Sequence, residues 1–198
     1  MTITPRIPIP TADELRPDVA ELLPLIAQPG REPARTMAVL ARQPDLLAPF
    51  LTWAAALALN GVLSQRHHEL LALRAAWNCR SAFEWVEHVE YARATDLTDD
   101  EIRAVTQPVT EGNRWAPVER ALLRAADELH TTTDVSDETW SVLAEMLAPA
   151  ALVELLFVAG QYTMLSMVAN AAGIEPPTGS DPAPWIDERG GRSALDRG

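Results

Sequence analysis

The sequence predicts an all-α protein, with one helical domain between two extended arms. Apolar residues recur at helical spacing through the middle of the chain, and no segment alternates as a strand does. Proline is concentrated towards the two ends. With 198 residues, 47% of them hydrophobic, the chain is long enough to bury a core. We expect a proline-rich N-terminal arm over 1–34, a helical domain over 35–175 and a flexible or docking tail over 176–198.

The arms are recognised by residues that interrupt helices. Repeated proline in the first 33 residues predicts an extended chain with at most a short helix near 19–26. The C-terminal tail combines glycine, proline, aspartate and arginine, a composition typical of segments without a core of their own. Trp185 favours a docked tail, because an indole gains nothing in solvent.

The helices of the first half have readable ends. Pro44 is expected in the first turn of a helix that ends at Asn60, because proline is tolerated at that position and Asn-Gly ends helices. Ser64 is the expected N-cap of a helix over 65–78. The next helix is expected over 80–95.

The second half continues in the same way. Thr98 with Glu101 three residues later forms a capping box, which marks a helix start. An amphipathic helix is expected over 117–130, and another begins at Ser136. The segment 149–172 is apolar on nearly all sides, so we expect it in the core or at an oligomer interface.

Composition excludes several functions. A net charge of -12 and a pI near 4.7 argue against nucleic acid or an anionic membrane as partner, since both require a basic face. The single cysteine, Cys79, cannot form an intramolecular disulfide. We expect a cytoplasmic protein, because the first residues lack the order of a secretory signal and no apolar stretch reaches a membrane span.

The strongest candidate site lies in the segment 81–88. Ser81, Glu84 and His88 are spaced i, i+3 and i+7, so on a helix they share one face. Phe83 and Trp85 flank the carboxylate, and a carboxylate beside an imidazole on an apolar helix suits proton transfer. The alternative is an ordinary i,i+4 pair on a solvated helix edge.

A metal site is not expected here, although histidines are concentrated in this region. His67 and His68 are adjacent, so at most one can face the same pocket as Glu69. No His-x-x-x-His or Glu-x-x-His pair has the spacing that a helical metal site uses.

Several runs of residues resemble the carboxymuconolactone decarboxylase family, which is related to alkylhydroperoxidase D. They are RHHELLALR at 66–74 and FEWVEHVEYA at 83–92, followed by the segments 119–130 and 154–162. The resemblance covers roughly 35–175. It implies an all-helical fold, a small-molecule substrate, and a homo-oligomer, trimer, hexamer or dimer, with the site near a subunit interface.

The departure from this family concerns its thiols. The peroxidase branch carries C-x-x-C-x-x-x-H with a glutamate one helix earlier, which corresponds to Ser81, Glu84, His88 and Glu69 here. Neither cysteine position holds sulfur, so peroxide reduction by a pair of thiols is unavailable. The arginine that usually precedes the upstream glutamate is His68 in this chain.

Three residues are assigned candidate catalytic roles. Burial would favour the protonated form of Glu84, which would then serve as general acid or base. His88, one turn away, is the candidate to exchange protons with it, unless a backbone carbonyl satisfies its ring. The resemblance implies a proton-relay role for Glu69, whereas a salt bridge to Arg66 or Arg74 is the alternative.

Four residues are candidates for binding the substrate: Ser81, Trp77, Trp85 and Tyr162. Trp77 precedes the Ser81 face by one helical turn, which suggests an aromatic wall beside the acid–base pair. For the aromatic residues, a place in the core is the alternative.

The function expected is cofactor-free acid–base chemistry on a small carboxylic acid, lactone or related carbonyl compound. The reaction would be decarboxylation, isomerisation or a related proton transfer. Two alternatives remain: a thiol-dependent hydroperoxidase that uses Cys79, and a non-catalytic ligand-binding oligomer. The ordinary interpretation of Cys79 is a small buried hydrophobic residue.

Overall fold

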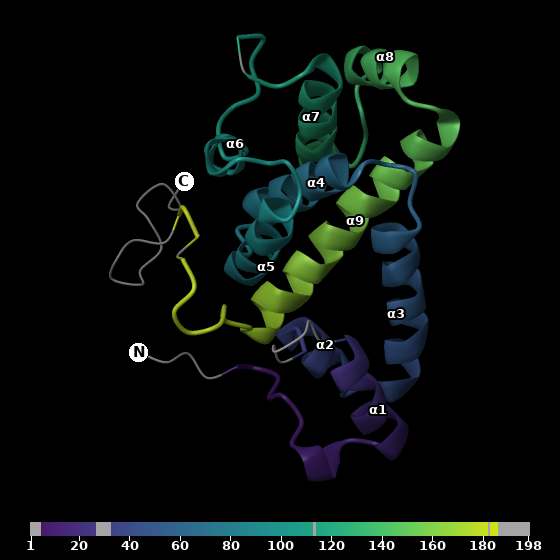
Figure 1. Ribbon diagram of the computed structural model, residues 1–198, viewed down its shortest axis with the longest axis vertical. Helices are drawn as coiled ribbons and strands as arrows, with labels where there is room; N and C mark the ends of the chain where they lie inside the picture. The colour runs from purple at the N-terminus through teal and green to yellow at the C-terminus, as the bar shows by residue number, and fades with distance from the viewer. Residues whose placement is uncertain (1–4, 27–32, 113, 182, 186–198) are drawn as a thin grey trace.

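A computed structural model describes residues 5–26, 33–112, 114–181 and 183–185, and every regular element in these ranges is a helix (Figure 1). The prediction of an all-α fold is therefore confirmed. In chain order the elements are the 3₁₀ helices η1 (Ala12–Glu14) and η2 (Leu23–Ile26), which flank α1 (Pro17–Leu22), then α2 (Arg35–Leu40), α3 (Pro44–Leu59), α4 (Gln65–Asn78), α5 (Ala82–Arg93), α6 (Asp99–Ala104), α7 (Pro117–Thr132), α8 (Asp137–Met146) and α9 (Pro149–Ala172).

The expected helix ends are confirmed where the capping chemistry is local. Proline occupies the first turn of α3, α7 and α9. The side chain of Ser64 accepts a hydrogen bond from the His67 amide at 3.2 Å, which caps α4. At the end of α9, Gly173 takes the left-handed conformation with φ of 70°, and the Ile174 amide reaches back to the Ala169 carbonyl at 2.9 Å.

The break between α4 and α5 differs from the expectation. The helix predicted over 80–95 begins only at Ala82, because Arg80 adopts φ of 51° and interrupts the helical hydrogen bonds. Cys79 is the C-cap of α4 and Ser81 is the N-cap of α5. Cys79 therefore lies on a different element from Glu84.

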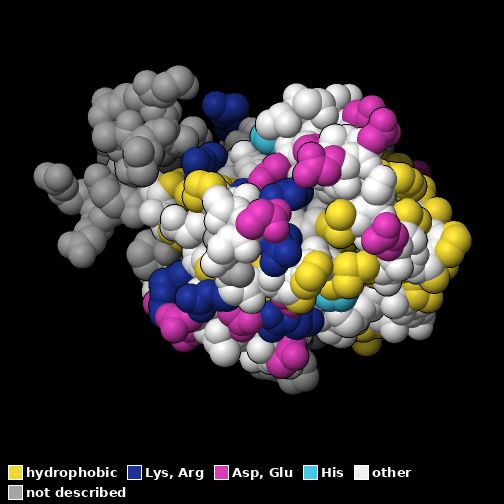
Figure 2. Space-filling view, turned by 90° about the horizontal axis from the view of Figure 1, so that it is seen from above, with side chains coloured by type: hydrophobic (Ala, Val, Ile, Leu, Met, Phe, Trp, Pro, Cys, Tyr) yellow, Lys and Arg dark blue, Asp and Glu magenta, His cyan; other side chains and the backbone are white. Residues whose placement is uncertain are grey.

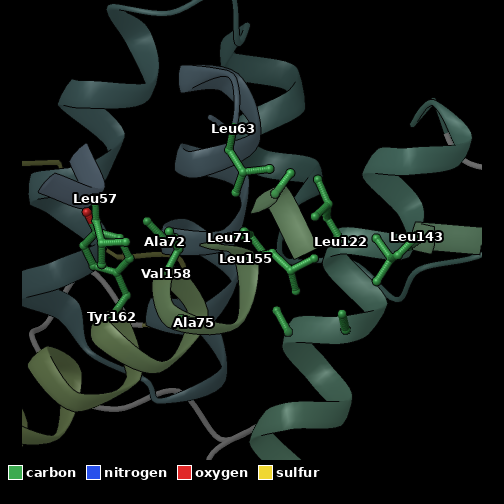
Figure 3. Close-up of a cluster of buried hydrophobic side chains, with 14 residues drawn as sticks. Leu57, Leu63, Leu71, Ala72, Ala75, Leu122, Leu143, Leu155, Val158 and Tyr162 are labelled. Atoms are coloured by element: carbon green, nitrogen blue, oxygen red, sulfur yellow. The ribbon is translucent and has the colours of Figure 1, made fainter. Parts of the chain in front are cut away.

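Helix α4 is the centre of the bundle and packs against α5, α7 and α9. Nine of its consecutive residues, from His68 to Ala76, are buried. The principal core cluster joins Leu71 and Ala72 of α4 to Leu122 of α7 and Leu155 of α9 (Figure 3). A polar side chain between α4, α5 and α9 is therefore in the interior of the bundle.

The N-terminal region contains more helix than expected. Besides α1 and η2, helix α2 begins at Arg35 and packs against α3 and α9. Val19, Leu23, Ala41 and Leu47 form a small separate core. Parts of the predicted arms, at 1–4, 27–32 and 186–198, lie outside the described residues.

The C-terminal tail reaches the bundle through Trp185. This side chain is 5% exposed, and its ring packs edge-on against Trp77 at 5.4 Å and Trp85 at 5.7 Å between centroids. The tail therefore covers α4 and α5 at this point with an aromatic contact.

Helix α9 is the one described helix that is long and apolar enough to cross a membrane by length and composition. In its most apolar window, 44% of the residues are buried inside the protein, and core helices of soluble proteins meet the same criterion.

Candidate active site

Four polar side chains from three helices meet in the interior of the bundle. Glu69 comes from α4, Glu84 and His88 come from α5, and Tyr162 comes from α9. Each is at most 6% exposed. Burial of this kind excludes the alternative of a solvated pair on a helix edge, and it places ionisable groups where their pKa values respond strongly to neighbours.

His88 is held by Glu69. The Nδ1 atom of the imidazole lies 2.8 Å from the Oε2 atom of the Glu69 carboxylate. Burial alone lowers the pKa of His88, but the charge of Glu69, the hydrogen bond to it and the charge of Glu84 act together to raise it. This pair fixes the ring with Nδ1–H directed at Glu69 and leaves Nε2 on the side of Glu84.

Glu84 has little to stabilise its charged form. Its Oε2 atom lies 3.8 Å from His88 Nε2, beyond hydrogen-bond length, and the carboxyl group is buried beneath α9 and α4. Burial raises the pKa of Glu84 to about 7; the charge of His88 opposes this rise and the charge of Glu87 adds to it. A carboxyl group with this pKa exchanges a proton readily at neutral pH.

Tyr162 connects His88 to a second histidine. Its ring packs edge-on against the His88 ring at 4.3 Å between centroids. Its hydroxyl group is hydrogen-bonded to His68 Nε2 at 2.8 Å. Burial and the neighbouring carboxylates raise the pKa of Tyr162 well above its ordinary value, while burial lowers the pKa of His68. Both groups are therefore neutral near pH 7.

The structure brings Ser81 into the same face as Glu84, as the spacing predicted. Its side chain is fully buried at the start of α5. Within the described residues its Oγ atom has no hydrogen-bond partner, and neither has His68 Nδ1. Buried polar atoms are normally satisfied, so these two mark places where a ligand or water can be accommodated.

The two tryptophans of the expected aromatic wall lie elsewhere. Trp77 and Trp85 pack against Trp185, and Trp85 belongs to the core cluster formed with Ile102 and Trp115. Since α4 ends before Ser81, Trp77 is not on α5, the helix that carries Glu84 and His88. The aromatic residues in ring contact with His88 are Tyr162 and Tyr91, the latter at 5.5 Å.

The expected alternative for Glu69, a salt bridge to arginine, is not what the structure contains. Arg66 pairs with Glu101 and Glu119, each at 2.6 Å. Arg74 binds Asp127 through two nitrogens, at 2.6 and 2.7 Å. Glu69 instead faces His88, which leaves the two arginines to link α4 with α6 and α7.

Sequence reasoning did not find the partnership of His68 with Tyr162, nor the place of Tyr91 beside His88. The sequence gives only a weak indication of these contacts. His68 follows the N-cap of α4 by four residues, which predicts its angular position around α4 but not the helix that it faces. His67 is half-buried on a different side of α4. No group of three or more metal-ligating side chains occurs in the described part of the chain.

Of the two tyrosines in ring contact with His88, Tyr91 reaches the surface and is 40% exposed. A pocket of about 250 Å³ lies on another face of α5, between Arg93, Ile102 and Asp181.

Comparison with known proteins shows the fold and matches part of the chain to a known family. Residues 44–128 match the model of the carboxymuconolactone decarboxylase family. No curated protein matches the sequence.

Three solved structures share the fold. An uncharacterized peroxidase-related protein from Silicibacter sp. TM1040 is 16% identical, with a TM-score of 0.77 over 88% of this chain and 92% of its own. A second, from Ralstonia eutropha JMP134 with an alkylhydroperoxidase AhpD core, is 20% identical, with a TM-score of 0.73 over 90% and 95%.

The third is a protein of unknown function from Agrobacterium tumefaciens, described as a candidate AhpD antioxidant defence protein. It is 20% identical, with a TM-score of 0.65 over 70% of this chain and 95% of its own. Residues 44–128 thus resemble the carboxymuconolactone decarboxylase family, and the whole bundle shares the all-α fold of AhpD-like structures, although the paired cysteines of the peroxidase branch are absent from this chain.

Proposed function

We propose that this protein is a cofactor-free acid–base enzyme that moves a proton to or from carbon in a small carbonyl compound, lactone or carboxylic acid. The observation that carries the proposal is the buried Glu84 carboxyl group, whose pKa of about 7 lies near working pH. General acids and bases are most effective when their pKa lies close to the ambient pH.

The arrangement supports a separate role for each of the three residues Glu84, His88 and Glu69. Glu84 delivers the proton to the reacting carbon or removes it. His88 lies next to Glu84 through Nε2 and exchanges protons with it, while Glu69 orients the ring and stabilises its charged form. The 3.8 Å separation allows a side-chain rotation to close the contact between Glu84 and His88.

Two reactions fit these roles. In an isomerisation, Glu84 takes a proton from one carbon and returns it to another after the electrons have shifted through the carbonyl group. In a decarboxylation, the bond to the departing carboxylate breaks and its electrons pass into the conjugated carbonyl system. Glu84 then protonates carbon, so that carbon dioxide leaves and one proton is taken up.

Hydrogen exchange at carbon tests the proposal without knowledge of the natural substrate. Small ketones and lactones are incubated with the protein in deuterated buffer, and loss of the signal of the acidic C–H is followed by NMR. We expect exchange with the wild type, and loss of it in Glu84→Gln and in His88→Ala. Cys79→Ser is the matched control and should retain the wild-type rate. Near-wild-type exchange by either site variant would contradict the assignment.

A thiol-dependent hydroperoxidase is the second candidate, because the Cys79 Sγ atom lies 3.8 Å from His130 Nδ1. Peroxide reduction would require the thiolate to attack a peroxide oxygen and form sulfenic acid, which an added thiol must then reduce. Burial raises the pKa of Cys79, which disfavours the thiolate. Peroxide consumption that disappears in Cys79→Ser and persists in Glu84→Gln would favour this function.

We also propose that the protein works as a homo-oligomer. Large apolar side chains are exposed along α3 and α9, and Figure 2 shows apolar side chains gathered along one side of the molecule. Those on the two helices include Trp53, Leu59, Leu156, Phe157, Met164, Met167 and Val168. Patches of this kind are typical of interfaces. Light scattering should give a mass above 21.6 kDa, reduced in Phe157→Glu.

A ligand-binding oligomer without chemistry is the remaining alternative. It is favoured if a ligand binds at the Glu84 face while no exchange at carbon is detected, and if Glu84 titrates at its ordinary pKa.

A further inference from the structure

Most of the charged groups around the candidate site are carboxyl groups. The charged groups that influence Glu84 are His88 and Glu87, and those that influence His88 are Glu69, Glu84 and Glu87. The one cation of the cluster, His88, therefore faces two carboxyl groups. The chain contains no lysine, so any further fixed positive charge would have to come from an arginine.

The arginines that flank the cluster in sequence are held elsewhere. Arg66 is bound to Glu101 and Glu119. Arg74 is bound to Asp127 and to the backbone carbonyls of Val105 and Gln107. Both guanidinium groups are thus engaged in ion pairs and hydrogen bonds that join α4 to neighbouring parts of the bundle.

Arg80 also lies on another side. Its guanidinium carbon is 3.8 Å from the centroid of the Trp77 ring and 5.6 Å from that of Trp185. This cation stacks on the aromatic contact that holds the C-terminal tail. Its contacts are therefore with Trp77 and the tail residue Trp185.

His68 does not supply a cation either. It directly precedes Glu69 and is 2% exposed, and its Nε2 atom is hydrogen-bonded to the Tyr162 hydroxyl group. Its burial favours the neutral imidazole. In the described part of the chain, the polar groups around His88 are thus the carboxyl groups of Glu69, Glu84 and Glu87, the neutral imidazole of His68, and the hydroxyl groups of Tyr162 and Tyr91.

From this charge distribution we infer that the site selects an uncharged substrate, such as a ketone, an aldehyde or a lactone, and rejects carboxylates. The inference rests on the proposed function and narrows it to isomerisation or a related proton transfer in a neutral carbonyl compound, because decarboxylation would require a substrate that carries a carboxylate. A carboxylate would lose its hydration beside Glu69 and Glu84, and the one cation there, His88, is already paired with Glu69 at 2.8 Å.

A neutral carbonyl group has suitable partners in the site. The Ser81 hydroxyl group is fully buried and unpaired among the described residues, one helical turn from Glu84. A carbonyl oxygen accepts a hydrogen bond from Ser81 Oγ, and also from Glu84 while its carboxyl group is protonated, below a pKa of about 7. Above this pKa, a neutral amide can donate its N–H to the Glu84 carboxylate, whereas a ligand carboxylate is repelled by it.

Binding of a matched pair of ligands tests this preference. Benzamide and benzoate have nearly the same shape and differ in charge at pH 8. We expect ligand-observed NMR titration of the wild-type protein to show benzamide bound about tenfold or more tightly. Equal or tighter binding of benzoate would overturn the inference, and so would the absence of benzamide binding at millimolar concentration.

Two variants locate the origin of the preference. In Glu84→Gln, benzoate binding should improve about tenfold, while benzamide binding stays within about twofold. Glu90→Gln is the matched control, because it removes the same charge from an exposed position of α5. An equal effect of both variants would show that net charge, and not the site, is responsible, and would overturn the inference.

Titration of binding is independent of turnover. If the amide preference is present while exchange at carbon is absent, the proposed function fails and the substrate preference stands. If exchange occurs and the preference is absent, only this inference fails. The thermal unfolding of Glu84→Gln confirms that the variant is folded, and the wild-type comparison remains decisive if it is not.

Discussion

Helix α4 takes part in two clusters of charged side chains, one partly buried and one buried, and they differ in the group that faces each carboxylate. Near its N-terminus, Arg66 binds Glu101 and Glu119 at 2.6 Å each. The hydrogen bond from Arg66 lowers the pKa of Glu101 to about 2. One turn further, Glu69 faces His88, and burial raises the pKa of Glu84 to about 7.

The difference shows how one helix can serve stability and chemistry. A guanidinium group keeps its partners charged over the whole physiological range, so the first cluster does not exchange protons near pH 7. An imidazole is a titratable partner, and a carboxyl group without a guanidinium responds mainly to burial. Only the second cluster can therefore act as acid and base at neutral pH.

The largest expected effect separates the two clusters by activity. Glu84→Gln should reduce exchange at carbon by about 10²–10⁴-fold, because the amide cannot donate or accept the transferred proton. Glu101→Gln should leave the rate of the folded protein within about twofold. Rates are measured by NMR below the unfolding temperature, and equal losses in the two variants would remove the distinction.

The next effect separates the clusters by stability. Arg66→Met should destabilise the fold by about 3 kcal/mol, because it leaves the buried Glu119 carboxylate without its partner. Arg93→Met is the control, since its ion pairs with Glu90 and Asp99 are exposed and should contribute about 1 kcal/mol or less. Urea denaturation of both variants checks the comparison, which fails if Arg93→Met costs as much.

The pH dependence of stability gives an effect of similar size. The folded protein retains the Glu84 proton up to a pKa of about 7, whereas the unfolded chain releases it near 4.5. Stability is thus lost as pH rises between these values, by about 3 kcal/mol. The raised pKa of His88 acts in the same direction, since its contribution is lost as pH rises through the folded pKa.

Urea denaturation at pH 5 and pH 8 measures this loss. We expect the free energy of unfolding of the wild type to be lower at pH 8 than at pH 5. The variant Glu84→Gln should show a smaller decrease between the two pH values. Identical decreases in wild type and variant would mean that Glu84 ionises as readily in the folded protein as in the unfolded chain.

The smallest effect concerns the neighbour of His88. Tyr162→Phe keeps the ring packing and removes the hydrogen bond to His68, which should cost about 1–2 kcal/mol. A double-mutant cycle with His68→Gln isolates the pair from other changes. Additive losses in the cycle would show that the two side chains do not interact.

Much of the fold could be predicted from the sequence, because helix ends depend on local chemistry. Pro44 and Pro149 open helices at the expected residues, and the capping box of Thr98 with Glu101 is formed. Helix α2 was not predicted as a separate element, although it begins at Arg35, where the helical domain was expected to begin. The end of α4 was not predicted either, since arginine at position 80 gives no sign of a left-handed conformation.

The candidate site was predictable to the extent that it lies on one helix. Ser81, Glu84 and His88 share a face because the helical repeat requires it. The contact of His88 with Glu69, and the place of Tyr162, depend on how α4 and α9 pack against α5. Nothing in the spacing of residues specifies such packing, which also explains why Trp77 and Trp85 were expected in the wrong place.

The central claim is that Glu84 takes up and releases its proton near neutral pH, and its titration tests this most directly. Protein with ¹³C-labelled glutamate carboxyl groups is followed by NMR from pH 4 to pH 9, and the signal absent from Glu84→Gln identifies the residue. The account predicts that this carboxyl group titrates with a pKa of about 7. A pKa near the ordinary 4.5 would mean that Glu84 is a carboxylate throughout the physiological range, and would contradict its role as the acid.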